Sequence, residues 1–173
     1  MPKYMQDDDQ ISDGVNLLIS ILVRYPEIGT VSFDPDNNSI KLTFMLSGIS
    51  WNAEIKTAKQ CIIDSIAAYH MLQNIHPDIT DVILTDAYEQ IAMLTIKRDV
   101  HTLSKGEIAL IIALLRDGFR ERLMSDQNDT MQEEDLMLQE ELIDDMLENL
   151  KKKRTGHGLI GIREDGRVLV FNK

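Results

Sequence analysis

The chain has 173 residues, enough for one domain with its own core, and its 43% of hydrophobic residues excludes wholesale disorder. Its one cysteine, Cys61, excludes a disulfide framework and a zinc knuckle, and the apolar run around it predicts a buried small hydrophobe. The net charge of −11 argues against nonspecific nucleic-acid binding by the body of the chain, because such binding depends on Lys and Arg.

The hydropathy of the sequence indicates the cellular compartment of the protein. The N-terminus is acidic and lacks the apolar stretch of a signal peptide. No apolar run approaches the ~20 residues of a membrane span. We therefore expect a cytoplasmic protein that does not engage a membrane.

The N-terminal part predicts a helix followed by a pair of strands. Ser12 or Asp13 can cap a helix whose apolar residues recur at helical spacing until Pro26 stops it. Two strand-like runs, 29–33 and 40–45, flank a dense turn signal. That turn begins like an EF-hand calcium loop but lacks the Gly and Glu that such a loop requires, so we interpret it as a hairpin turn.

A second unit with the same order of elements follows. A long amphipathic helix is expected over 51–73, and strands are expected over 81–85 and 90–97. Ser104 can cap a third helix, with Glu107 three residues later completing a capping box. The two strand–strand–helix units superpose at an offset of 51 residues. An internal duplication would produce this offset, although any two such units would align as well.

The C-terminal part combines a polar linker, a charged helix and a hairpin. Residues 126–150 contain ten acidic and no basic residues, and the helix predicted over 133–154 is amphipathic. The runs 159–162 and 168–171 flank an Asp-Gly turn signal. Because an isolated hairpin is marginal in water, this one must pack on the body, join its sheet edge, or pair with another chain.

These patterns predict an α+β fold. The expected architecture is a two-layer antiparallel sheet with helices on one face, in the order αββαββα, followed by a C-terminal amphipathic helix and β-hairpin. We divide the chain into an α+β core domain at 10–124, a polar linker at 125–132, and a segment at 133–173 that holds the acidic helix and terminal hairpin.

Candidate chemistry is sparse, and no catalytic, cofactor or metal site is predicted. The GxGxxG match at 156–161 follows a helix and precedes a strand, the reverse of the order that dinucleotide binding needs. The acidic stripe of the fourth helix lacks the His partners of bundle metal sites, so we expect a solvated face. The histidines lack metal-ligand spacing and are expected at the surface. An enzyme would need a pocket where several of five ionisable residues converge: His70, His76, His101, Asp78 and Asp86.

Two surfaces of the segment 133–173 are candidates for partner binding. Apolar residues of the fourth helix and the hairpin are predicted to bind a protein: Leu138, Leu142, Ile143, Met146, Leu147, Leu150, Val168 and Val170. A basic element could bind nucleic acid: Lys151, Lys152, Lys153, Arg154, Arg163 and Arg167. Aromatic residues that would stack on bases are nearly missing from this element, so helix capping and neutralisation of the acidic helix are the preferred interpretation.

The predicted function is therefore noncatalytic. We expect an adaptor or chaperone-like assembly protein of a bacterial type that binds a protein partner or itself as a homo-oligomer. The alternative is a nucleic-acid or ribosome-associated factor that uses the basic C-terminal element. A small enzyme with a site between sheet and helices is the third hypothesis.

Overall fold

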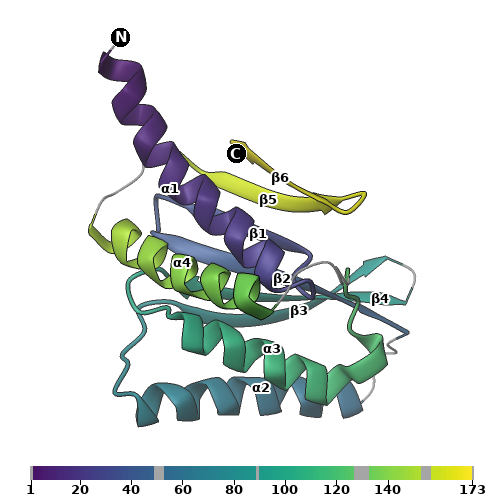
Figure 1. Ribbon diagram of the computed structural model, residues 1–173. Coiled ribbons are helices and arrows are strands. Elements are labelled where there is room, and N and C mark those ends of the chain that lie inside the picture. The colour runs from purple at the N-terminus through teal and green to yellow at the C-terminus, as the bar shows by residue number, and fades with distance from the viewer. Residues whose placement is uncertain (1, 49–52, 89, 127–132, 153–156, 173) are drawn as a thin grey trace.

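The computed structural model describes residues 2–48, 53–88, 90–126, 133–152 and 157–172 (Figure 1). Within these ranges it confirms the predicted α+β class, with four α-helices and a six-stranded antiparallel sheet. In chain order the elements are α1 (Pro2–Arg24), β1 (Thr30–Asp34), β2 (Ser39–Ser47), α2 (Ala53–Leu72), β3 (Thr80–Tyr88), β4 (Ile91–Asp99), α3 (Lys105–Phe119), the 3-10 turn η1 (Arg120–Arg122), α4 (Glu133–Lys152), β5 (Leu159–Glu164) and β6 (Arg167–Asn172).

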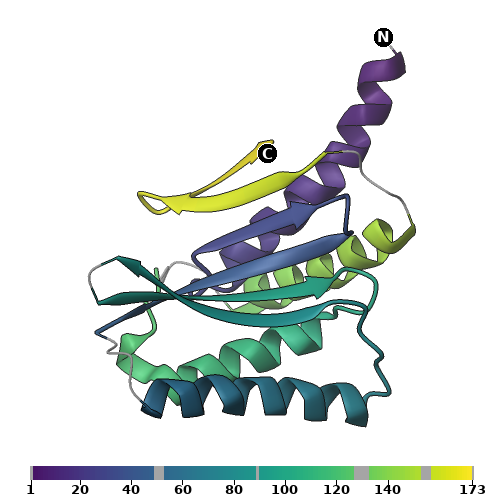
Figure 2. The ribbon, with the colours of Figure 1, turned by 180° about the vertical axis from the view of Figure 1, so that it is seen from behind.

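The sheet is built from three hairpins in the strand order β3-β4-β2-β1-β5-β6. The hairpins β1–β2 and β3–β4 meet through β2 and β4, and β5–β6 extends the sheet beside β1. Strands β3 and β6 therefore form the two edges. Helices α1 and α4 cover one face near β1 and β5, whereas α2 lies beyond the β3 end with α3 beside it (Figures 1 and 2).

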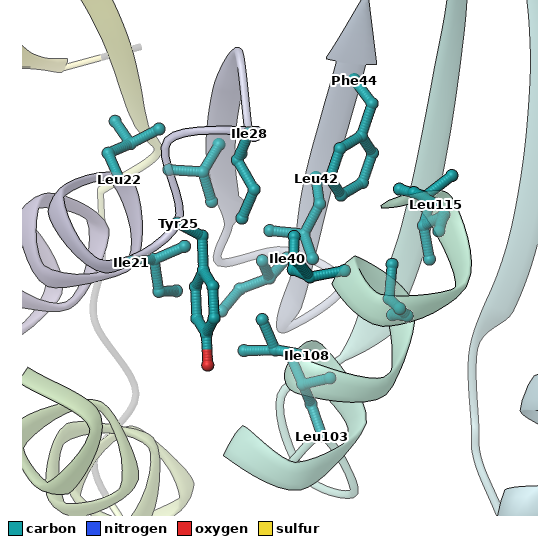
Figure 3. Packing of buried hydrophobic residues seen from close by; sticks show 14 of the residues in the cluster. Ile21, Leu22, Tyr25, Ile28, Ile40, Leu42, Phe44, Leu103, Ile108 and Leu115 are labelled. Carbon is teal, nitrogen blue, oxygen red and sulfur yellow. The ribbon is translucent and has the colours of Figure 1, made fainter. Parts of the chain in front are cut away.

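The core forms where the apolar faces of the four helices meet the inner face of the sheet. Figure 3 shows the ring of Tyr25, just after α1, among Ile21, Ile40 of β2 and Ile108 of α3. All four side chains are almost completely buried. Burial of one large aliphatic side chain contributes about 1.5–3 kcal/mol, so this junction stabilises the contact between helices and sheet.

Helix α1 begins earlier than the sequence predicts. Its first residue is Pro2, so the predicted start at Ser12 or Asp13 was wrong. Proline suits the first helical position, because its φ is already helical and the amide that it lacks would have no partner inside the helix. The helix ends at Arg24, immediately before the Tyr25-Pro26 step, as predicted.

The C-terminal hairpin extends the chain's own sheet, one of the three outcomes that the sequence left open. Strand β5 pairs antiparallel with β1, and α4 packs against α1. Gly161 lies so close to α1 and β1 that a Cβ there would meet Leu22 at 2.9 Å and Val31 at 3.2 Å. Arg163 Nη2 donates to three main-chain carbonyls at the end of α1, at 2.8–3.3 Å. The segment predicted as an appended unit thus shares the core of the first 124 residues.

Two local predictions are confirmed. The segment between β1 and β2 is a hairpin turn, in which Asp34 Oδ1 accepts from the amide of Asp36 and Asn38 has a φ of 50°. Ser104 caps α3, because its hydroxyl accepts from the amide of Glu107 at 3.3 Å. The carboxylate of Glu107, however, points to other partners than the capping box implies.

Cys61 is exposed on α2, so the prediction of a buried small hydrophobe was wrong. Its neighbour Ile62 takes the inward position, and the next inward position is Ile66, one helical turn later. The apolar run 60–63 therefore contains one buried residue, one half-buried residue and two exposed ones rather than a fully buried segment. Trp51, the first residue of the predicted helix, lies outside the described residues.

Candidate functional site

A buried charged cluster joins α2, β4 and α3. Arg98, the inward-facing residue near the end of β4, forms two hydrogen bonds with the carboxylate of Glu107, at 2.5 and 2.9 Å. His70 Nε2 lies 2.7 Å from Glu107 Oε1. Because Glu107 is paired with Arg98 and accepts hydrogen bonds as a carboxylate, His70 donates through Nε2. All three side chains are at least nine-tenths buried.

Asp99 extends the cluster to the start of β3. Its Oδ1 accepts from Arg98 Nη1 at 2.5 Å and from two amides of the segment that leads into β3. Its Oδ2 accepts from the amide and hydroxyl of Thr102. Burial alone would raise the pKa of Asp99. The hydrogen bonds from Ile79 and Thr102 and the charge of Arg98 outweigh burial and lower that pKa.

The cluster is a structural anchor, and one of its buried members also lines a hollow. Glu107 and Arg98 are enclosed, and their charges satisfy each other, so neither is available to a ligand. His70 is the member that reaches an adjoining hollow, whose wall it helps to form. The rotamers of Arg98 and Glu107 are locked by hydrogen bonds, so they hold His70 in a fixed position in the wall of the hollow.

The hollow is an apolar groove between α2 and the edge strand β3, with a volume of about 370 Å³. One wall is a stripe of α2 at helical spacing, formed by Ile63, Ile66, Ala67 and His70. The opposite wall is formed by Pro77, Thr80, Asp81 and Val82. Figure 2 shows α2 running along the β3 end of the sheet, with the connection to β3 at one end of the helix. The volume lies within the ~300–1,000 Å³ range of small-ligand sites.

The backbone of β3 presents hydrogen-bonding groups at its free edge. The amide of Asp99 donates to the carbonyl of Ile79, so Thr80 and Arg98 form a non-hydrogen-bonded pair of the β3–β4 ladder. By alternation, the amides and carbonyls of Thr80, Val82 and Leu84 point away from β4. Since β3 is an edge strand, these groups face the side on which α2 and the groove lie.

A second hollow, of about 450 Å³, lies beside the loop between α1 and β1. Its charged walls include Glu27 and Arg163. Glu27 Oε1 accepts from Arg116 Nε at 2.6 Å, and Arg163 is engaged with the end of α1. These contacts tie α3 and β5 to the loop, although Glu27 Oε2 and Arg163 Nε are buried without a hydrogen-bond partner.

The apolar residues predicted to bind a partner are mostly buried within the chain. Ile143, Met146, Leu147 and Leu150 pack in the core, where α4 meets α1. Val168 and Val170 are half-buried against the core on the inner face of β6. Leu138 and Leu142 are exposed on α4, together with Met137. Of the predicted set, Leu138 and Leu142 are therefore the two residues that face solvent.

The basic residues predicted as a nucleic-acid surface do not form one continuous exposed patch among the described residues. Arg163 is directed into the fold, and Lys151 pairs with Glu148 at 2.8 Å. Lys152 and Arg167 are exposed. Lys153 and Arg154 lie outside the described residues.

The ionisable residues named by the enzyme hypothesis do not converge on the groove. Among them only His70 contributes to the groove, and the prediction that it lies at the surface was wrong. His76, His101, Asp78 and Asp86 are exposed. Within the described residues, no group of three or more His, Cys, Asp and Glu could hold a metal ion. The part of the GxGxxG match that is described leads into β5, so a strand follows it, as predicted.

The sequence contains a signal for the buried cluster that the predictions above missed. Ala92, Leu94 and Ile96 alternate along β4 as inward residues, and the same alternation places Arg98 inward. His70 follows Ile62 and Ile66 at helical spacing, so it belongs to the apolar face of α2. An arginine and a histidine that both face the core require a buried acidic or polar partner.

Within the described part of the chain, no helix has the length and hydropathy needed to cross a bilayer. Comparisons with protein-family models, curated protein sequences and solved structures return no match to this chain.

Proposed function

We propose that this chain is a noncatalytic protein-interaction module that binds an extended segment of a partner protein as an additional strand beside β3. The observation that carries the proposal is the free backbone edge of β3, at Thr80, Val82 and Leu84, beside an apolar groove. Strand addition to an exposed edge gains affinity from main-chain hydrogen bonds, and pockets for alternate side chains provide specificity.

The groove suits such a ligand because its two walls come from different elements. A strand paired with β3 would direct every second side chain toward the inner face, where Ile63, Ile66 and Ala67 form the opposite wall. The floor is held by His70 through Glu107, so little ordering is needed on binding. The other edge, β6, differs because its inner-face valines pack against the core.

The apolar contribution is tested with two alanines of α2. Both Ala67 and Ala68 are exposed, but only Ala67 lines the groove, whereas Ala68 lies beside Cys61 on another side of the helix. A displayed library of random decapeptides is selected against the wild-type chain, and synthetic copies of the enriched peptides are measured by calorimetry. We expect Ala67→Arg to weaken binding at least tenfold and Ala68→Arg, with the same charge change, to leave it within twofold.

The backbone contribution is tested at Thr80. Thr80→Pro removes an amide that points away from β4, so no ladder bond is lost, and proline is tolerated at the first residue of an edge strand. We expect it to weaken the selected peptides several-fold more than Thr80→Ala does. Hydrogen exchange should show new protection of the Val82 and Leu84 amides on binding. Selection of no peptide, or protection confined to β6, would overturn the proposal.

Self-association remains a prediction of the sequence. It is measured by sedimentation of the chain from low to high micromolar concentration. A homo-oligomer would also have to account for the exposed Met137, Leu138 and Leu142 of α4. The nucleic-acid alternative has less support, since Arg163 is engaged within the fold and Lys151 with a neighbouring carboxylate.

A further inference from the structure

Resting on the proposed function, we infer that the segment bound beside β3 is cationic, with aliphatic side chains alternating with Lys or Arg. The charges around the groove and the two faces of the edge strand β3 indicate this composition of the ligand.

The polypeptide around the groove is acidic over a long stretch. Between Lys59 and Lys97 the sequence contains five acidic residues and neither Lys nor Arg: Asp64, Asp78, Asp81, Asp86 and Glu89. Three of them, Asp78, Asp81 and Asp86, are exposed at or near β3, and Asp81 itself lines the groove. The cations nearest in the ladder are Lys97, which is half-buried opposite Asp81, and Arg98, which is enclosed with Glu107. The accessible rim is therefore negative.

The two faces of β3 assign the two residue types to alternate positions. Thr80, Val82 and Leu84 share the inner face, so ligand side chains on that face enter the apolar groove. Asp81, Ile83 and Thr85 share the outer face, so the intervening ligand side chains lie beside them. Ile83 is 49% exposed, and it can cover the aliphatic stem of a Lys whose ammonium reaches Asp81.

The same charges disfavour the two other occupants of this edge. Pairing β3 with β3 of a second copy would bring Asp81 and Asp86 of both copies onto one strand pair without a basic partner on either strand, and like charges on paired strands are destabilising. A nucleic acid would place phosphates against the same carboxylates. A cationic segment is the occupant that the rim attracts.

The inference is tested with two matched peptides, both acetylated and amidated. One alternates Val with Lys over seven residues, and the other carries Glu in place of Lys. At low salt we expect the Lys peptide to bind at least tenfold more tightly, and the preference should shrink at 0.3 M salt because exposed charges are screened. Asp81→Asn should reduce the preference several-fold. Asp117→Asn, the same charge change at an exposed position of α3, should leave it unchanged.

The outcomes separate this inference from the function on which it rests. Equal binding of both peptides, with protection of the Val82 and Leu84 amides, would retain strand addition and overturn the cationic preference. Tighter binding of the Glu peptide would do the same. Failure of both peptides and of every library peptide would overturn the two proposals together. Protection of the same amides in a ligand-free dimer would make a second copy the occupant and overturn the inference.

Ala67→Arg should abolish binding of the Lys peptide, and Ala68→Arg should retain it.

Discussion

The two ends of the sheet hold their helices in different ways. At the β5 end, α1 presents Leu17, Leu18, Ile21 and Leu22 to the sheet without measurable exposure, and α4 closes over the same core. At the β3 end, α2 contacts mainly α3 and leaves Met71 and Leu72 each 83% exposed. The first end is closed by apolar packing. The second combines three buried isoleucines of α2 with a buried charged cluster, and a groove remains beside them.

This difference has a physical consequence for binding. Apolar closure gains free energy from the contact area that it removes from water, so α1 and α4 pack closely over the shared core. At the β3 end, α2 packs through the buried Ile55, Ile62 and Ile66 and is tied to α3 by His70 and Glu107. The groove remains beside these contacts, between α2 and β3. The β3 end is therefore where we propose that a partner adds a strand without displacing the core.

The largest expected effect tests whether the β3 end depends on its charged cluster. Arg98→Ala should destabilise the fold by about 3–5 kcal/mol, because Glu107 and Asp99 would remain buried without their cation. Urea unfolding followed by circular dichroism measures the loss. Arg167→Ala, at an exposed arginine of β6, is the control and should change stability by less than about 0.5 kcal/mol. A loss below about 1 kcal/mol for Arg98→Ala would show that the cluster is not the anchor.

The second prediction tests apolar closure at the other end. Leu147, on α4, is 1% exposed, so Leu147→Ala should cost about 2–5 kcal/mol through lost burial and the cavity left behind. Met71→Ala, at an exposed position of α2, should stay within about 0.5 kcal/mol. The same urea titration compares the two variants. Similar losses for both would mean that α2 is packed as tightly as α4, contrary to the comparison.

The fold could be predicted from sequence because its signals are local. Turn residues such as those around Asp34 and the cap at Ser104 act within a few positions, and the hydrophobic period of each element identifies its buried face. The start of α1 was missed because a capping residue inside a longer helix looks the same as one at its start.

The candidate site could not be predicted in the same way because it depends on contacts between distant segments. Glu107 fits a capping box in the sequence, and only its distance to Arg98 and His70 shows the other role. The groove depends on the side of β4 at which β3 pairs, which leaves β3 as an edge. Alternation along β4 could have placed Arg98 inward, but no sequence period shows which strand lacks a neighbour.

The third prediction compares two glycines, one at each end. Gly161→Ala should cost about 1–3 kcal/mol, because its Cβ would press on the buried side chains of Leu22 and Val31. Gly118→Ala, on α3, meets nothing within 4 Å and should stabilise the helix by about 0.5–1 kcal/mol. Thermal unfolding of the two variants gives the signs. A stabilising Gly161→Ala would show that the contact between β5 and α1 is looser than the distances indicate.

The smallest expected effect is a change in the slope of stability against pH, and it concerns the polar anchor. Hydrogen bonds from Ile79 and Thr102 and the charge of Arg98 outweigh burial and lower the pKa of Asp99 in the folded chain. The unfolded chain therefore binds more protons near the ordinary Asp pKa of about 3.9. The stability that Asp99 contributes is fully present above that pH, and it is lost as the pH falls through the lower folded pKa. In Asp99→Asn this loss cannot occur, so the variant should be less stable at pH 7, with a shallower decline in acid.

Urea midpoints measured from pH 6 to pH 2 test this, with Asp117→Asn on the surface of α3 as the control that keeps the wild-type slope. An unchanged slope in Asp99→Asn would mean that the carboxylate gains nothing from its donors on folding, and the segment leading into β3 would then be held by the backbone ladder alone.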